Sequence, residues 1–175
     1  LYPLTHILGR SFSTPEGWGL ANYVLMLGSE RFLRITLNSL AVTLLSAGIA
    51  ILLAYSFAYA VQRSTLPGRN LLRMIAVLPL FAPSLVQAQG LVLMFGRNGL
   101  VNRSFGLDIQ IYGYRGIVVA MVLYVFPYAF LILSAALAVA DARLYESAEM
   151  LGASKARTFR TVTLPATRYG LAAAI

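Results

Sequence analysis

The chain has 175 residues, of which 59% are hydrophobic and only 11% are charged, and its formal net charge is +8. Soluble domains are about 45–50% apolar and about 25% charged, so a soluble fold of this size would leave too much apolar surface in water. The basic residues are spread through the short segments between apolar runs instead of clustering on a polar domain. We therefore expect a lipid bilayer as the solvent and no nucleic-acid partner.

The chain has no cysteine, which excludes thiol catalysis, disulfides and cysteine-based metal sites. Its single histidine, His6, is a poor metal ligand by itself. We therefore predict no metal, no cofactor and no catalytic residue. The chain starts at Leu1 and ends at Ile175 inside an apolar run, so we expect it to be a piece of a longer protein.

Residues 1–34 are predicted to be an entry segment ahead of the first span. Beside Trp18, four residues recur at helical spacing and indicate a short amphipathic helix: Leu20, Tyr23, Val24 and Leu27. This periodicity fits a helix lying in the membrane interface and equally a helix packed on the spans.

Residues 35–175 are predicted to be an all-α, polytopic transmembrane helical bundle. About 20 apolar residues suffice to cross the hydrocarbon layer, and three apolar runs are long enough: 35–61, 71–96 and 116–140. A fourth span begins at residue 169 and is truncated at residue 175. Pro79 and Pro83 predict a kink or break in the second run, because proline removes a backbone donor. The glycine-rich segment Arg97–Tyr114 is predicted to be a loop.

Two neutral polar residues in the second run, Gln87 and Gln89, are candidates for lining a transport pathway. They follow the proline pair, and broken helices often border transport sites. Hydrogen bonding between helices, or a position near the outer interface, would explain the same residues.

The arginine and lysine residues predict the orientation of the chain. One side of the predicted bundle holds eight: Arg63, Arg69, Arg73, Arg143, Lys155, Arg157, Arg160 and Arg168. The other side holds six: Arg10, Arg31, Arg34, Arg97, Arg103 and Arg115. Since cytosolic loops carry the excess of basic residues, we predict that the first side is cytosolic and that residues 1–34 are periplasmic.

The predicted cytosolic loop at residues 141–168 is patterned as two capped helices. Asp141 is a suitable N-cap for a helix that ends at a left-handed Gly152, and Ser154 is a suitable N-cap for a second helix over Lys155–Thr161. Pro165 then suits the first turn of the next span. Arg143 and Glu146 are spaced to form an ion pair on the first helix.

One face of the first predicted helix carries Leu144, Ala148 and Leu151. Such a loop can dock a protein partner, or it can rest on lipid headgroups with its basic residues toward them. The pattern by itself leaves both interpretations open.

The loop resembles the EAA loop of binding-protein-dependent ABC transporter permeases, the MetI-like family. That motif is Glu-Ala-Ala, three residues, Gly, nine residues, and Ile-x-Leu-Pro. The matching positions are Glu146-Ser147-Ala148, Gly152 and Val162-Thr163-Leu164-Pro165, with Ser147 in place of Ala and Val162 in place of Ile. The segment Phe12–Leu40 also looks like the entry into the core of this family.

The resemblance implies an inner-membrane, multi-pass permease whose EAA loop docks a cytosolic ABC ATPase dimer, which binds and hydrolyses the ATP. It also implies a periplasmic substrate-binding protein and a second permease half, from the same chain, a homodimer or a paralogue. Glu146 would make the polar docking contact, Ala148 would allow close approach, and Gly152 would form the turn. The docking set carried over is Glu146, Ser147, Ala148, Gly152, Ala153, Leu164 and Pro165.

The phrase from Leu78-Pro79-Leu80 to Phe95–Leu100 resembles the ferric iron, thiamine and 2-aminoethylphosphonate group of these permeases. Members of that group often carry two EAA loops in one chain. The resemblance implies ferric iron or an organophosphonate such as 2-aminoethylphosphonate as substrate. The alternative is a membrane scaffold that docks a cytosolic partner without transport.

Overall fold

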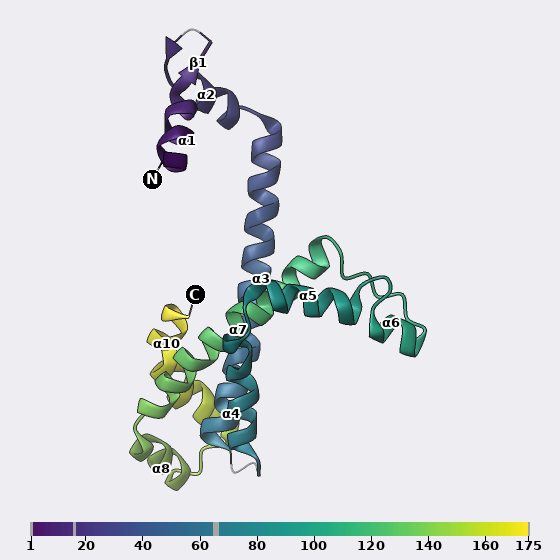
Figure 1. The fold of residues 1–175 in the computed structure, drawn as a ribbon. Coiled ribbons are helices and arrows are strands. Elements are labelled where there is room, and N and C mark those ends of the chain that lie inside the picture. The colour runs from purple at the N-terminus through teal and green to yellow at the C-terminus, as the bar shows by residue number, and fades with distance from the viewer. Residues whose placement is uncertain (1, 16, 65–66, 175) are drawn as a thin grey trace. The chain divides into compact units, whose positions relative to one another are not determined.

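A computed structural model describes residues 2–15, 17–64 and 67–174 (Figure 1). Residues 1 and 175, which bound the two predicted segments 1–34 and 35–175, lie outside the described residues. Contacts divide the chain into two units, Leu1–Val42 and Thr43–Ile175. The division falls inside a long helix, α3 (Glu30–Arg63), which begins ahead of the apolar run predicted at 35–61.

The first unit is a small helical hairpin whose two helices are joined by a short two-stranded sheet. It contains α1 (Tyr2–Phe12), the antiparallel strands β1 (Ser13–Thr14) and β2 (Gly17–Trp18), and α2 (Ala21–Leu27). The Tyr23 hydroxyl donates to Ser11 Oγ at 2.8 Å, and the Asn22 amide donates to the Ser13 carbonyl at 2.9 Å. A helix is thus present at the predicted position, with Tyr23 hydrogen-bonded to its own hairpin, and its amphipathic, interfacial character stays a prediction.

The second unit is a set of helices arranged around α7 (Tyr114–Val139), which packs on α4, η1, α5 and α10 (Figure 1). Besides the end of α3 it contains α4 (Arg69–Val77), η1 (Leu78–Phe81), α5 (Ser84–Phe95), α6 (Leu100–Phe105), α7, α8 (Ala142–Met150), α9 (Lys155–Thr158), η2 (Phe159–Thr163) and α10 (Leu164–Ala173). Among the described residues, α3 and α7 are each long and apolar enough to cross a membrane.

The core of this unit sets small residues of α3 against bulky residues of α7. Ala50, Ala54 and Ala58 recur every fourth position and are fully buried. Ala54 and Ala58 belong to one cluster with three buried side chains of α7: Phe130, Leu133 and Leu137. A stripe of small side chains at this spacing lies on one helix face, and it leaves room for large partners without cavities.

The proline pair breaks the second apolar run instead of only kinking it. The two parts, Arg69–Phe81 and Ser84–Phe105, are bent by 108° relative to each other and together are apolar enough for a third span. Pro83 has no N–H to offer the Pro79 carbonyl, which would be its helical partner four residues earlier. The Gln87 side-chain amide donates to that carbonyl at 2.6 Å and to the Ala82 carbonyl at 3.2 Å.

The segment predicted as a loop, Arg97–Tyr114, contains the short helix α6. The buried Asn102 side chain organises it: its amide donates to the carbonyls of Gly96 and Ile109 at 2.9 and 3.0 Å, and its oxygen accepts from the Ile109 amide at 3.0 Å. Asn102 thus supplies backbone partners that an irregular segment lacks.

We predict that Gln87→Leu destabilises the protein while Gln89→Leu does not. The first change leaves the Ala82 carbonyl without its side-chain donor and removes one of two donors to the Pro79 carbonyl, which also accepts from the Ala82 amide at 3.2 Å. Each lost hydrogen bond costs about 0.5–1.5 kcal/mol. Gln89 lies two residues further on, is exposed, and has no such contact in the described chain. Thermal unfolding of the two purified variants in the same detergent checks this, and equal melting temperatures would contradict it.

Candidate functional site

The helix α8 is capped at both ends by residues next to it in the sequence. At its start the Asp141 carboxylate accepts from the Arg143 amide at 2.9 Å, as the sequence predicts for an N-cap. At its end Gly152 adopts φ +69°, and its amide donates to the Glu149 carbonyl at 2.9 Å. The Ala153 amide reaches the Ala148 carbonyl at 3.0 Å, which completes a Schellman motif.

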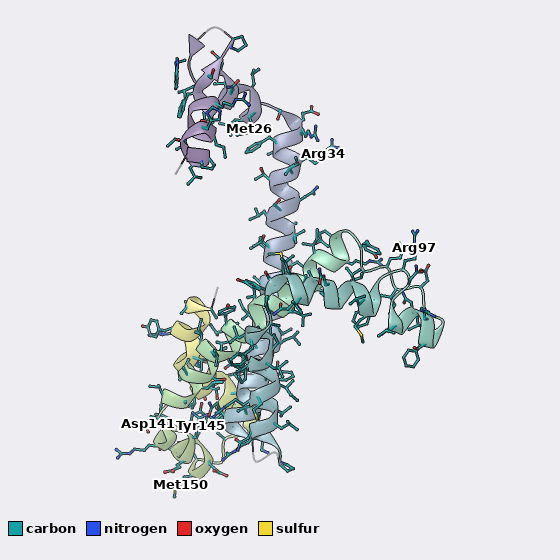
Figure 2. The ribbon with its side chains drawn as sticks, in the orientation of Figure 1. Met26, Arg34, Arg97, Asp141, Tyr145 and Met150 are labelled. Carbon is teal, nitrogen blue, oxygen red and sulfur yellow. The ribbon has the colours of Figure 1, made fainter. Side chains whose placement is uncertain are left out.

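The outer surface of α8 combines a carboxylate with two apolar side chains. Glu146 is exposed, and Met150 and Leu151 are 88% and 86% exposed. Figure 2 shows Met150 at the outer end of α8, pointing away from the neighbouring helices. The helical periodicity places Leu151 on one face of this helix, but the docking set carried over from the EAA motif includes neither Met150 nor Leu151. Two large apolar residues just ahead of the glycine turn are the signal that would have added them.

The predicted docking residues on α8 differ in their accessibility. The Ser147 hydroxyl donates to the Arg143 carbonyl at 2.8 Å, so its polar group has a partner within the helix. Ala148 is half-buried. The ion pair predicted between Arg143 and Glu146 is not formed among the described residues, and both side chains are exposed, where such a pair gains little.

The second predicted helix, Lys155–Thr161, does not end before the next span. Ser154 caps it, accepting from the Arg157 amide at 3.3 Å, but α9 then continues through the π-helical segment η2 into α10. Pro165 therefore lies in the first turn of α10 without a break ahead of it. The wider π turn, where backbone bonds reach five residues, accommodates a residue that lacks an N–H.

A cluster of polar and aromatic side chains joins α8 to three other helices. The Arg63 guanidinium, at the end of α3, lies 3.8 Å from the centroid of the Tyr145 ring on α8. The Tyr145 hydroxyl donates to Thr163 Oγ1 at 3.2 Å, and the Thr167 hydroxyl donates to the Thr163 carbonyl at 2.9 Å. This cluster brings the EAA-like residues on α8 and the Leu164-Pro165 pair into one framework.

The two pathway candidates lie in different surroundings. Gln87 borders a cavity of ≈ 200 Å³ between α5 and α7, with Ser84, Leu91, Met121 and Tyr124 also in its wall. Gln89 is exposed on another face of α5, beside Leu85 and Val92. The structure thus does not bring the two glutamines together, and pathway lining stays a prediction for both.

The fold and the site define a class of protein: a helical membrane protein in which a capped, exposed helix follows a long span. The chain belongs to the family of binding-protein-dependent transport system inner membrane components, whose model matches residues 50–175. The predicted all-α fold and the predicted family are thereby confirmed.

Curated relatives and a solved structure agree with this assignment. The chain is 33% identical over 139 residues to the molybdenum transport system permease protein ModB of Escherichia coli K12, covering 77% of this chain and 60% of ModB. It is 29% identical over 181 residues to the ferric transport system permease protein FbpB of Actinobacillus pleuropneumoniae, covering 98% of this chain and 26% of FbpB. The chain therefore spans less than two thirds of either relative.

The fold is similar to a chain in the crystal structure of a bacterial alginate ABC transporter in complex with an alginate pentasaccharide-bound periplasmic protein. The TM-score is 0.78 at 23% identity, over 98% of this chain and 64% of that chain. At this identity the similarity concerns the fold.

We predict that Gly152→Ala loosens the end of α8, whereas Gly152→Asn has a much smaller effect. A Cβ at this position meets no atom within 4 Å, so the cost is backbone strain alone, about 1–2 kcal/mol for a left-handed alanine. Asparagine tolerates that conformation better. Hydrogen exchange of the α8 amides measures the difference; equal protection in both variants would refute the role of the glycine.

Proposed function

We propose that this chain is part of the permease subunit of an ABC importer in the bacterial inner membrane, with α8 on the cytosolic side. In this proposal α8 is the coupling helix and docks into a groove of a cytosolic ATPase. The observation that carries the proposal is the surface of α8, where Glu146, Met150 and Leu151 are exposed on a helix closed at both ends. Family membership supports the same assignment.

The chemistry of that surface suits a protein groove better than a lipid headgroup layer. Apolar anchors surrounded by a polar rim are typical of protein interfaces. Glu146 and Glu149 lie on the exposed part of α8, and carboxylates are repelled by anionic headgroups. A partner groove that pairs the carboxylate and buries Met150 and Leu151 satisfies both kinds of group.

A coupling helix must stay folded while it transmits the docking free energy of the ATPase to the permease. ATP can shift the permease between two conformations only by the difference in docking free energy between them. Moving an equilibrium from 1:99 to 99:1 takes about 5.5 kcal/mol, which a helix transmits only if it does not unfold under the load. Two closed ends and a connection to the bundle meet that requirement in α8.

The remaining parts of the proposed transporter lie outside these 175 residues. The ATPase dimer binds and hydrolyses ATP, a periplasmic binding protein delivers substrate, and a second permease half completes the pathway. The solved alginate transporter, which is in complex with a periplasmic protein, supports the binding-protein partner. Gln87, at the cavity between α5 and α7, is the better of the two pathway candidates.

For the substrate we propose ferric iron or an organophosphonate such as 2-aminoethylphosphonate. The similarity to FbpB, which covers 98% of this chain, supports the ferric alternative. The similarity to ModB supports an oxyanion instead. Calorimetry of the cognate periplasmic binding protein with Fe³⁺, 2-aminoethylphosphonate and molybdate decides among these three ligands.

We predict that Glu146→Lys weakens capture of the ATPase by the full-length permease at least about tenfold, because it reverses a charge at the docking surface. Asp108→Lys is the matched control: it makes the same charge change at an exposed acid in the segment after α6. Co-purification of tagged permease with the ATPase measures capture, with and without each change.

Equal capture by parent and Glu146→Lys would contradict the docking proposal. Normal capture together with absence of any ATP-dependent uptake, for all three ligands, would favour the alternative of a scaffold that binds a cytosolic protein. Weak capture by Asp108→Lys as well would mean that the effect is not specific to α8.

A further inference from the structure

The contact between α8 and the rest of the bundle depends on a small number of side chains. Among the α8 side chains that the structure describes, only Tyr145 and Ala148 are partly buried, and Tyr145 is far the larger of the two. Figure 2 shows Tyr145 on the side of α8 toward the neighbouring helices. Whatever Tyr145 binds therefore determines how firmly α8 is held.

The group that covers the Tyr145 ring is the guanidinium of Arg63. Its Cζ lies 3.8 Å from the ring centroid, and its Nη2 donates to the carbonyls of Leu137 and Ala140 at 2.9 and 3.2 Å. Those carbonyls belong to the last turn and C-cap of α7, where a cation is favoured by the helix dipole and by unpaired acceptors. One side chain thus joins the ends of α3 and α7 to the coupling helix.

The other edge of the ring is held by the start of the next span. The Tyr145 hydroxyl donates to Thr163, which is fully buried, and Thr167 in turn bonds the Thr163 carbonyl and the Tyr55 hydroxyl. Tyr55 lies on α3, two turns before Arg63. Two routes therefore connect α3 with α8. Arg63 contacts α8 directly, and Tyr55 is linked to it through the threonines of η2 and α10.

We propose that Arg63 is the positioning residue that locks the coupling helix to α3 and α7, so that α8 and these spans follow the ATPase as one rigid body. The inference rests on the proposed docking of α8. Arginine suits this role because its planar guanidinium stacks on the ring while its edge donates to both carbonyls. A lysine ammonium is a point donor with no planar face and cannot make both contacts at once.

A distance measurement within the chain tests the lock. These 175 residues contain no cysteine, so once any cysteine elsewhere in the full-length permease is replaced by serine, spin labels can be placed at Arg143→Cys on α8 and Ser56→Cys on α3 in the permease bound to its ATPase. Pulsed electron paramagnetic resonance is recorded without nucleotide and with ATP plus vanadate. The parent is expected to give one narrow distance distribution that is the same in both states.

With Arg63→Ala added, we expect the distribution to broaden or split when ATP and vanadate are present, while ATPase capture stays within about twofold of the parent. Arg63→Lys is expected to behave like Arg63→Ala. Arg69→Ala, which removes an exposed arginine six residues later, is the matched control and is expected to behave like the parent. If Arg63→Ala cannot be purified, Tyr145→Leu tests the same contact from the other side.

The two proposals fail in different ways. If the parent does not capture the ATPase, the docking function is refuted. If captured Arg63→Ala, or captured Tyr145→Leu, keeps one narrow distribution in both nucleotide states, only the lock is refuted. Hydrogen exchange gives a second measure: each single change should raise α8 amide exchange at least about threefold. The double variant should raise it by less than the product of the two single effects, because both changes remove the same stacking contact.

Discussion

Every backbone carbonyl that loses its helical partner inside an apolar bundle needs another donor, and this constraint explains several polar side chains of the second unit. No water is at hand in hydrocarbon to replace a missing bond. Gln87 supplies donors where Pro83 breaks the helix, Arg63 supplies them at the end of α7, and Thr167 supplies one within η2 and α10. Gln87 and Arg63 lie where the regular hydrogen-bond ladder of a helix stops.

The helix α8 meets the same constraint at its two ends. Asp141 and Gly152 cap these ends, so the terminal hydrogen bonds of α8 are made within the chain itself. Its outward face is then free to carry Met150 and Leu151, which a soluble loop would avoid exposing. Capped ends and an exposed apolar end are the two properties that the proposed docking requires of α8.

The sequence predicted the features that depend on neighbours along the chain. The apolar runs, the caps Asp141 and Ser154, the left-handed Gly152 and the effect of the proline pair are all local, and the structure has them. The contacts of Arg63 with Tyr145, and of Tyr145 with Thr163, join distant positions, and no spacing rule pairs them. The sequence did not predict that α9 continues into α10. Proline is typical of a helix start, so Pro165 indicated a new helix, and the π turn ahead of it is not visible in the sequence.

The break at Pro83 also bears on how the protein is made. The nine residues of α4 and four of η1 reach about 20 Å, short of the roughly 30 Å that a helix needs to cross the hydrocarbon layer alone. Since α7 packs on both α4 and α5, this part of the chain acquires its partner only once α7 has been synthesised. We therefore expect insertion of residues 69–105 to lag behind translation and to finish together with α7.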